Sequence, residues 1–245
     1  MTKRPQKDDY QLKERFKTES EVFDKFTLLN LSKLIKKEII ATVDYPISTG
    51  KEANVFRGTT PDGRYIAVKI YKVDTAPFFR KDEYLEGDPR FGKIKHTPRD
   101  IVIAFARKEF KNLQLCNNAK VHAPKPYYNL NNVVVMEFLG KGDLPYPTLN
   151  LIGSQNPKKE LASLLADIKK MHDAGLVHAD LSEYNILLVD DTPYLIDFGQ
   201  GVVLAHPSAT RFFERDVSVV MKYYSKYGVC QMDDLEKTLE KLRKK

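Results

Sequence analysis

The sequence predicts an α+β fold of two lobes, with a strand-rich half followed by a helix-rich half. Three observations predict it: short apolar strands separated by turn residues dominate residues 41–140, helical periodicity dominates residues 141–245, and the pattern changes between Gly140 and Pro147. With 245 residues, 42% of them hydrophobic, the chain can bury a sizeable core. A cleft between two such lobes is a natural small-molecule site.

The first lobe is preceded by a polar extension. Within residues 1–40, the first twenty are polar and charged, and apolar residues then recur at helical spacing from Val22 to Ile40. We expect one or two amphipathic helices that pack on the domain that follows. The strands Ala53–Arg57 and Tyr65–Tyr71 come next, separated by a Thr-Pro-Asp-Gly turn signal.

The rest of the first lobe contains a long segment without clear periodicity. Residues 72–99 are charged, contain Gly and Pro, and are expected to be mobile. A helix is predicted over residues 100–115, and a buried strand over Val133–Phe138.

The second lobe begins with a well-delimited helix. Asn156 can cap it, Pro157 suits its first turn, and Gly175 can end it. Two strands, Ile186–Val189 and Tyr194–Ile196, are expected around a turn at residues 190–193. Helical segments around residues 210–226 and 233–244 complete the chain.

Composition excludes several classes of protein. No run approaches the roughly 18 apolar residues of a membrane span, and the N-terminus lacks the apolar centre of a signal peptide, so we expect a cytoplasmic protein. Cys116 and Cys230 are expected to be reduced thiols. The net charge of +7 and the basic residues 241–245 are compatible with RNA contact, but also with a solvated helix end.

Phosphoryl transfer needs a clamp on the phosphates, metal ligands and a group that orients the nucleophile. Lys69, near the end of the second strand, can project its ammonium group into the cleft and hold α- and β-phosphate oxygens. Many strands contain Val-Lys, so Lys69 alone would be interpreted as a surface residue.

A second motif, HADLSEYN, spans residues 178–185. It fits a kinase catalytic loop, in which Asp180 would accept the substrate hydroxyl proton or orient a water. Asn185 would give its amide oxygen to a metal ion. The alternative is an Asx-rich turn between a helix and a strand.

The third motif, Asp197-Phe198-Gly199, follows an apolar strand, and Asp197 would chelate the metal ions that bridge the β- and γ-phosphates. Each motif is short, but their order and spacing together predict a protein-kinase-like fold with a shortened helical C-lobe. In such a fold, a glutamate on a helix normally holds the phosphate-binding lysine. Glu109 is the candidate partner of Lys69, and the alternative interpretation is that Glu109 is a solvated residue on its helix.

These motifs resemble the RIO family of atypical protein kinases, and most closely its Rio-one subgroup. The resemblance covers about residues 40–230 and rests on STGKEANVF (48–56), DEYLEGDPRF (82–91), HADLSEYN (178–185) and IDFGQ (196–200). The segment before residue 41 is also too short for the winged-helix domain of the sister subgroup.

The resemblance implies ATP as cofactor, with Mg²⁺ as the default metal and Mn²⁺ as an alternative. Adenine would lie along Met136–Leu139, with Met136 as gatekeeper and backbone groups of Glu137 and Leu139 as partners. The nucleotide loop, within residues 48–56, has one glycine, Gly50, so its backbone should cover the phosphates less closely and its side chains would contact the nucleotide instead. The remaining expected nucleotide-binding residues are Ser48, Lys51, Glu52, Val55, Lys69 and Glu109.

The sequence also departs from ordinary protein kinases. Position 179 is Ala rather than Arg, no Ala-Pro-Glu follows Gly199, and only 46 residues come after it. The usual activation segment and peptide-docking helices do not fit in that length. We therefore expect that phosphorylation of Ser208 or Thr210 is not needed for activity.

Two functions remain open. The resemblance implies a non-specific serine/threonine protein kinase acting in small-ribosomal-subunit maturation, with pre-ribosomal RNA and protein as partners and no membrane. It equally implies an ATPase-type assembly switch in which Asp197 is transiently phosphorylated, which the short C-lobe favours. The signature at residues 48–56 argues against a small-molecule kinase. The presence of Lys69, Asp180, Asn185 and Asp197 argues against a pseudokinase.

Overall fold

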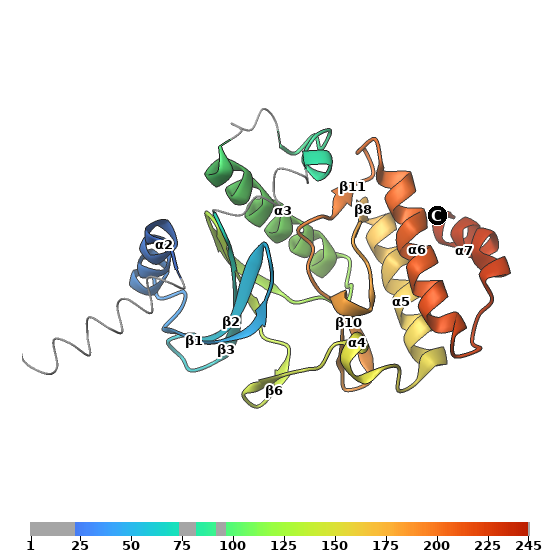
Figure 1. Cartoon of the computed structure of the whole chain (residues 1–245), viewed down its shortest axis with the longest axis horizontal. Coiled ribbons are helices and arrows are strands. Elements are labelled where there is room, and N and C mark those ends of the chain that lie inside the picture. The colour runs from blue at the N-terminus through green and yellow to red at the C-terminus, as the bar shows by residue number, and fades with distance from the viewer. Residues whose placement is uncertain (1–22, 74–81, 92–96, 245) are drawn as a thin grey trace, which may run out of the picture.

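The computed structural model describes residues 23–73, 82–91 and 97–244, and it has the predicted two-lobed α+β architecture (Figure 1). A five-stranded antiparallel sheet forms most of the first lobe, in the order β1-β2-β3-β5-β4. Its strands are β1 (Thr42–Thr49), β2 (Ala53–Thr59), β3 (Tyr65–Tyr71), β4 (Pro126–Leu130) and β5 (Val133–Glu137). Helix α3 (Pro98–Asn118) lies between this sheet and the helices of the second lobe (Figure 1).

Strand β3 separates two cores because its side chains alternate between the faces of the sheet. Ile66, Val68 and Ile70 belong to a core that includes Leu31 and Leu34 of helix α2 (Lys25–Lys36). Ala67 and Tyr71 belong to the other core, with residues of α3 and the second lobe. Lys69 shares this second face, which is why it points toward the space between the lobes.

Helix α3 starts as its sequence dictates. Thr97 accepts a hydrogen bond from the Asp100 N–H, and Pro98 occupies the first turn, where its missing N–H costs nothing. The prediction that residues 98 and 99 belong to the preceding loop is therefore wrong by two residues. Of the one or two helices expected before the sheet, one, α2, lies within the described residues 23–40.

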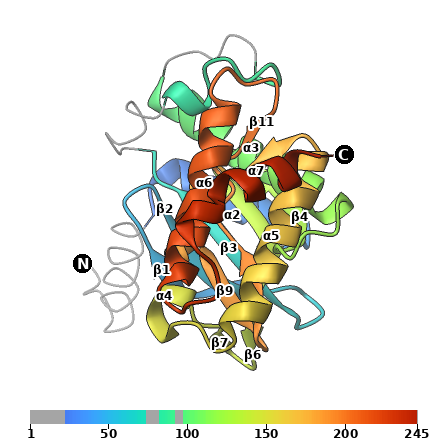
Figure 2. The ribbon, with the colours of Figure 1, turned by 90° about the vertical axis from the view of Figure 1, so that its right-hand side faces the viewer.

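The second lobe is built on helices that pack on one another, and Figure 2 shows them from the right-hand side of Figure 1. They are α5 (Pro157–Asp173), α6 (Ala209–Ser225) and α7 (Leu235–Arg243), with the one-turn helix α4 (Leu149–Ile152) nearby. Asn156 caps α5 by accepting from the Lys159 N–H, and Gly175 lies just beyond its end with φ of 83°, as predicted.

Short strand pairs carry the loops of this lobe. They are β9 (Ile186–Val189) with β10 (Thr192–Leu195), β8 (Leu176–Val177) with β11 (Val202–Val203), and β6 (Gly140–Lys141) with β7 (Leu144–Pro145). Three 3₁₀ turns, η2 (Asp82–Tyr84), η3 (Glu183–Asn185) and η4 (Met232–Asp234), complete the described elements.

Some boundaries differ from the prediction. Thr192 and Pro193 belong to β10, because Asp190 and Asp191 alone make the turn, with φ of 45° and 62°. Strand β1 was not predicted because Pro46 and two register shifts interrupt its pattern.

The expected mobile segment is only partly described, since residues 74–81 and 92–96 lie outside the described residues, as do 1–22. Residues 82–91, named here the insert, pack firmly: Tyr84, Leu85 and Asp88 are buried. Both cysteines are free thiols. Across the described ranges, none of the helices has the length and apolar character needed to cross a membrane.

Candidate active site

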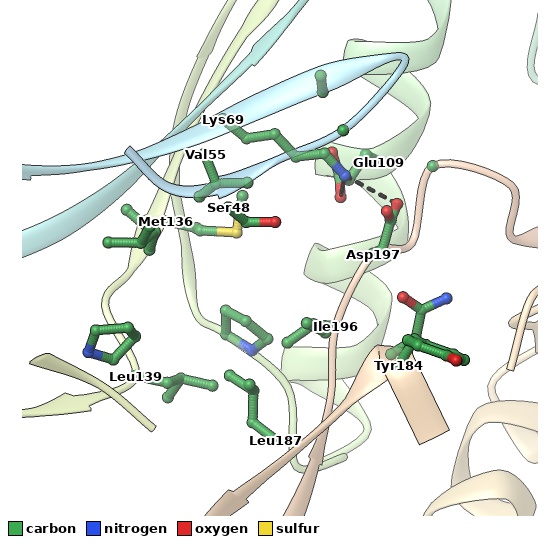
Figure 3. A pocket seen from close by; sticks show the side chains of 18 of the residues that line it. Ser48, Val55, Lys69, Glu109, Met136, Leu139, Tyr184, Leu187, Ile196 and Asp197 are labelled. Carbon is green, nitrogen blue, oxygen red and sulfur yellow. Dashed lines mark hydrogen bonds and ion pairs between the residues drawn. The ribbon is translucent and has the colours of Figure 1, made fainter. Parts of the chain in front are cut away.

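A cavity of about 460 Å³ lies between the two lobes, within the range of small-molecule sites (Figure 3). Its walls bring together all the residues expected at the site. They are Ser48, Lys51, Glu52, Val55, Lys69, Glu109, Met136, Glu137, Leu139, Asp180, Asn185 and Asp197. The structure thus gathers residues from β1 through to the loop after β10 around one space.

Lys69 is the centre of an ionic cluster. Its Nζ lies 2.7 Å from Oε1 of Glu109 and 2.8 Å from Oδ1 of Asp197 (Figure 3). Tyr71, also on β3, donates its hydroxyl to Oε2 of Glu109 at 2.7 Å. The alternative interpretations, a surface lysine and a solvated glutamate, are wrong, because both side chains are buried.

Burial and pairing set the charges of this cluster. Burial opposes the charge of Lys69, but the two carboxylates outweigh it and raise its pKa. Burial raises the pKa of Glu109, and Lys69 offsets this only in part. Surrounding protein atoms disfavour the charged form of Asp197 even though its side chain is 48% exposed at the cavity, but Lys69 outweighs this and lowers the Asp197 pKa, so this carboxylate is ionised at neutral pH.

Asp180 lies in a different environment. Asn185 Nδ2 donates to the Asp180 carbonyl at 2.8 Å, and Gln200 Nε2 donates to Asp180 Oδ2 at 2.9 Å. Because the Asn185 amide nitrogen faces Asp180, its amide oxygen is turned away from that residue. Helix α6 holds the loop of residues 178–185 in place, because its buried Asp216 accepts from the N–H groups of Ala179 and Leu181 at 2.7 and 3.2 Å.

The backbone is unusual beside both carboxylates. Ala179 has φ of 64° and Asp197 has φ of 63°, in the left-handed region that non-glycine residues seldom adopt. Surrounding contacts must hold such conformations in place. Neutral His178 contributes, donating from Nε2 to the Ile196 carbonyl at 3.0 Å, while burial lowers its pKa to about 4.

Part of the cavity wall is apolar. Val55, Ala67 and Met136 contribute to it from the sheet, and Leu187 and Ile196 contribute from the second lobe. At the end of β5 and just beyond it, the Glu137 N–H donates to the Lys125 carbonyl at 2.8 Å, and the Leu139 carbonyl accepts from the Tyr146 N–H at 3.0 Å. A flat apolar ring fits between these walls.

Two buried residues of α3 that were not predicted as site residues contact the loop that follows Asp197. Buried Asn112 donates from Nδ2 to the carbonyls of Phe198 and Gly201, each at 2.8 Å. Buried Lys108 donates to the Gln200 carbonyl at 3.1 Å and to the Tyr84 carbonyl of the insert at 2.6 Å. The sequence analysis did not predict a role for Asn112, Lys108 or Tyr71. It also assigned no role to Gln200, although this residue has a sequence signal, because it directly follows Asp197-Phe198-Gly199.

The predicted metal ligands, Asp197 and Asn185, are two oxygen donors that both line the cavity. Among the described residues no cluster of three or more His, Cys, Asp or Glu side chains could hold a metal ion. Mg²⁺ beside a nucleotide needs only one or two protein oxygens, since phosphates and waters complete its shell. The donor set therefore fits Mg²⁺ brought with a nucleotide and does not fit a resident metal cluster.

A sheet lobe and a helical lobe around a cavity, with a strand lysine paired to a helix glutamate, define a protein-kinase-like fold. Solved structures agree: the Rio2 kinase of Chaetomium thermophilum in a complex described as ADP/Mg2+-phosphoaspartate matches with a TM-score of 0.64 at 23% identity, over 86% of this chain and 65% of that one. A second Rio2 structure from the same organism matches with a TM-score of 0.63.

The family follows from sequence comparison. The RIO domain model matches residues 54–237. Rio1, the RIO-type serine/threonine-protein kinase of Haloferax volcanii, is 40% identical over 88% of this chain and 74% of its own length. The human serine/threonine-protein kinase RIO1 is 38% identical over 92% of this chain but only 41% of its own length. The chain belongs to the RIO family of serine/threonine-protein kinases, as its motifs indicated.

Proposed function

We propose that this chain is a Mg²⁺-dependent phosphotransferase that binds ATP in the cavity between its lobes and acts in small-ribosomal-subunit maturation. One observation carries the chemistry: Lys69 is held between Glu109 and Asp197 in a cavity that also has apolar walls around Met136. Phosphates would meet the ammonium group while adenine would meet the apolar walls. The ribosomal role rests on the resemblance alone.

The adenine assignment can be narrowed. Because the Glu137 N–H and the Leu139 carbonyl are already paired within the protein, the Glu137 carbonyl and the Leu139 N–H are the groups we assign to the base. Ser48, Lys51 and Glu52 border the same cavity from the turn between β1 and β2, where they would meet the phosphate side.

Each charged residue has a distinct proposed role. Asp197 and Asn185 would hold Mg²⁺, which neutralises charge on the β- and γ-phosphates when bound. Lys69 would bind α- and β-phosphate oxygens. Asp180 would accept the proton of an attacking hydroxyl or water, and the hydrogen bond from the Gln200 amide would orient its carboxylate for this role.

A second candidate is the assembly switch, in which Asp197 itself takes the γ-phosphoryl group. Its side chain is 48% exposed, it lines the cavity, and it is ionised. Its carboxylate oxygen would form a bond to phosphorus as the bond to ADP breaks, and water would then release phosphate and restore the carboxylate. The solved Rio2 complex whose description includes a phosphoaspartate supports this candidate.

The two candidates separate in one experiment. The full chain is incubated with γ-labelled ATP and Mg²⁺, with and without precursor particles of the small subunit. Label on serine or threonine of added protein supports the kinase. Label on the chain itself that hydroxylamine removes, with turnover stimulated by the particles, supports the switch. No Mg²⁺-dependent turnover under either condition would refute both.

A further inference from the structure

The side chain of Gln200 reaches Asp180 from outside the loop of residues 178–185. Its Nε2 lies 2.9 Å from Asp180 Oδ2, and the two residues line the same cavity. Asn185 Nδ2 approaches the same oxygen at 3.4 Å, at the limit of a hydrogen bond. The contact from Gln200 is therefore a well-formed hydrogen bond to this carboxylate and is shorter than that from Asn185.

The contact matters because the terminal torsion of an aspartate has no sharp preferred value. A hydrogen bond to one carboxylate oxygen selects an orientation. The hydrogen bond from Gln200 therefore contributes to the orientation of the Asp180 carboxylate.

Gln200 is itself held from behind by α3. Its carbonyl accepts from Lys108, and the carbonyls of Phe198 and Gly201 on either side accept from Asn112. Both α3 residues are fully buried. A side chain at Gly201 would collide with Asn112, since an added Cβ would lie 2.8 Å from Nδ2. The position of Gln200 is therefore fixed by the core rather than by a free loop.

We propose that Gln200 is a positioning residue for phosphoryl transfer, setting the orientation in which the Asp180 carboxylate meets the attacking hydroxyl or water. The proposal rests on the proposed function, in which Asp180 is the base. It assigns Gln200 no contact with nucleotide or metal. Its loss should lower kcat and leave ATP affinity nearly unchanged.

The test uses Gln200→Met, which keeps the length of the side chain and removes the donor. In Mg²⁺-dependent ATP turnover by the full chain, we expect kcat to fall about 10- to 100-fold, with the ATP dissociation constant changing less than about 3-fold. Gln114→Met, on the exposed face of α3, is the matched control and should match wild type. Thermal unfolding checks each variant.

A double-mutant cycle separates positioning from other roles. If Gln200 acts through Asp180, adding Gln200→Met to Asp180→Ala should lower the residual turnover less than about 2-fold. A full second loss, or a Gln200→Met variant that changes ATP affinity and not kcat, would overturn the proposal. Should Gln200→Met not fold, the isosteric Gln200→Glu takes its place, and it should lose at least as much because it sets two carboxylates together.

The cycle also tells the two proposals apart. If Asp180→Ala turns over normally, the role of Asp180 fails, and this inference fails with it. If Asp180→Ala is impaired while Gln200→Met and Gln200→Glu are not, only the inference is overturned.

Discussion

Among the residues that the structure describes, the two carboxylates of the cavity, Asp197 and Asp180, have different hydrogen-bond partners. Asp197 is bound to the Lys69 ammonium, whose other partner is the buried Glu109. The Asp180 carboxylate accepts from the neutral amide of Gln200, and Asn185 donates to the backbone carbonyl of Asp180. Strong ionic pairing suits a group that must stay charged to bind cations, whereas amide contacts suit a group that must take and release a proton. We call these the ionic half and the amide half of the site.

The largest effect is expected in the ionic half, from Asp197→Ala. Mg²⁺-dependent turnover should fall about 10⁴-fold or more, because the metal loses its charged ligand. Steady-state ATP turnover over a range of Mg²⁺ concentrations measures it. Asp173→Ala, at a surface ion pair with Lys169, is the control and should be unaffected. Near-normal turnover by Asp197→Ala would break the comparison.

Asp180→Ala addresses the amide half. The rate should fall about 100- to 1000-fold, the usual contribution of a general base, while ATP affinity is largely spared. Single-turnover rates and a fluorescent-nucleotide titration separate the two quantities. Lost nucleotide binding with retained turnover would mean that the roles of the two halves are reversed.

Glu109→Gln tests whether Lys69 depends on its buried partner. A glutamine here could still offer its oxygen to Lys69 by donating its NH2 to the Tyr71 hydroxyl, but the negative charge that pairs with the ammonium group would be lost. Because Asp197 still pairs with Lys69, we expect a loss of about 3 kcal/mol of unfolding free energy, at the low end for breaking a buried pair. Urea unfolding measures it, and exposed Glu236→Gln provides the baseline. Equal stability of both variants would argue against a buried ion pair.

His178 lies between the two halves, since it is two residues before Asp180 and donates to the carbonyl of Ile196, the residue before Asp197. Its contribution to the stability of the fold depends on pH. Its pKa is about 4 in the folded protein, below the roughly 6.5 of an unfolded histidine. The unfolded state therefore binds more protons between these values, and stability is lost as pH falls through this window. In His178→Phe, the fall in unfolding free energy from pH 7 to pH 4.5 should be about 2 kcal/mol smaller. Identical pH dependence in both proteins would contradict the assignment.

The smallest effect is expected outside both halves, at Ser208 and Thr210. Ser208 precedes the first turn of α6. The cations nearest in sequence are engaged: Arg211 pairs with Glu83 at 3.1 Å, and Arg215 donates to the Ala179 carbonyl. The double variant Ser208→Ala/Thr210→Ala should retain ATP turnover within about 2-fold. Loss of turnover that acidic replacements restore would show a phosphate switch.

The sequence predicted the parts of the site that obey local rules. Lys69 could be placed because β3 is an uninterrupted apolar strand, and Asp180, Asn185 and Asp197 because they occupy short motifs. Glu109 could be chosen because its helix lies between Lys69 and the hinge-like strand.

Other parts depend on contacts distant in the chain. Nothing in the local pattern of α3 distinguishes Lys108 or Asn112 from solvated helix residues, because the carbonyls they bind lie about ninety residues away. The buried turns of the insert were missed for the same reason: its Gly and Pro content is typical of a loop, whereas its burial comes from contacts with α3 and α6.

Helix α3 carries Glu109 toward Lys69, and Asn112, one turn further along, toward the loop that contains Asp197. The same helix therefore holds both Lys69 and the loop that follows Asp197. A rotation of α3 that withdrew Glu109 from Lys69 would also strain the Asn112 bonds to Phe198 and Gly201. A movement of this helix would therefore disturb the Lys69–Glu109 pair and the loop that contains Asp197 together.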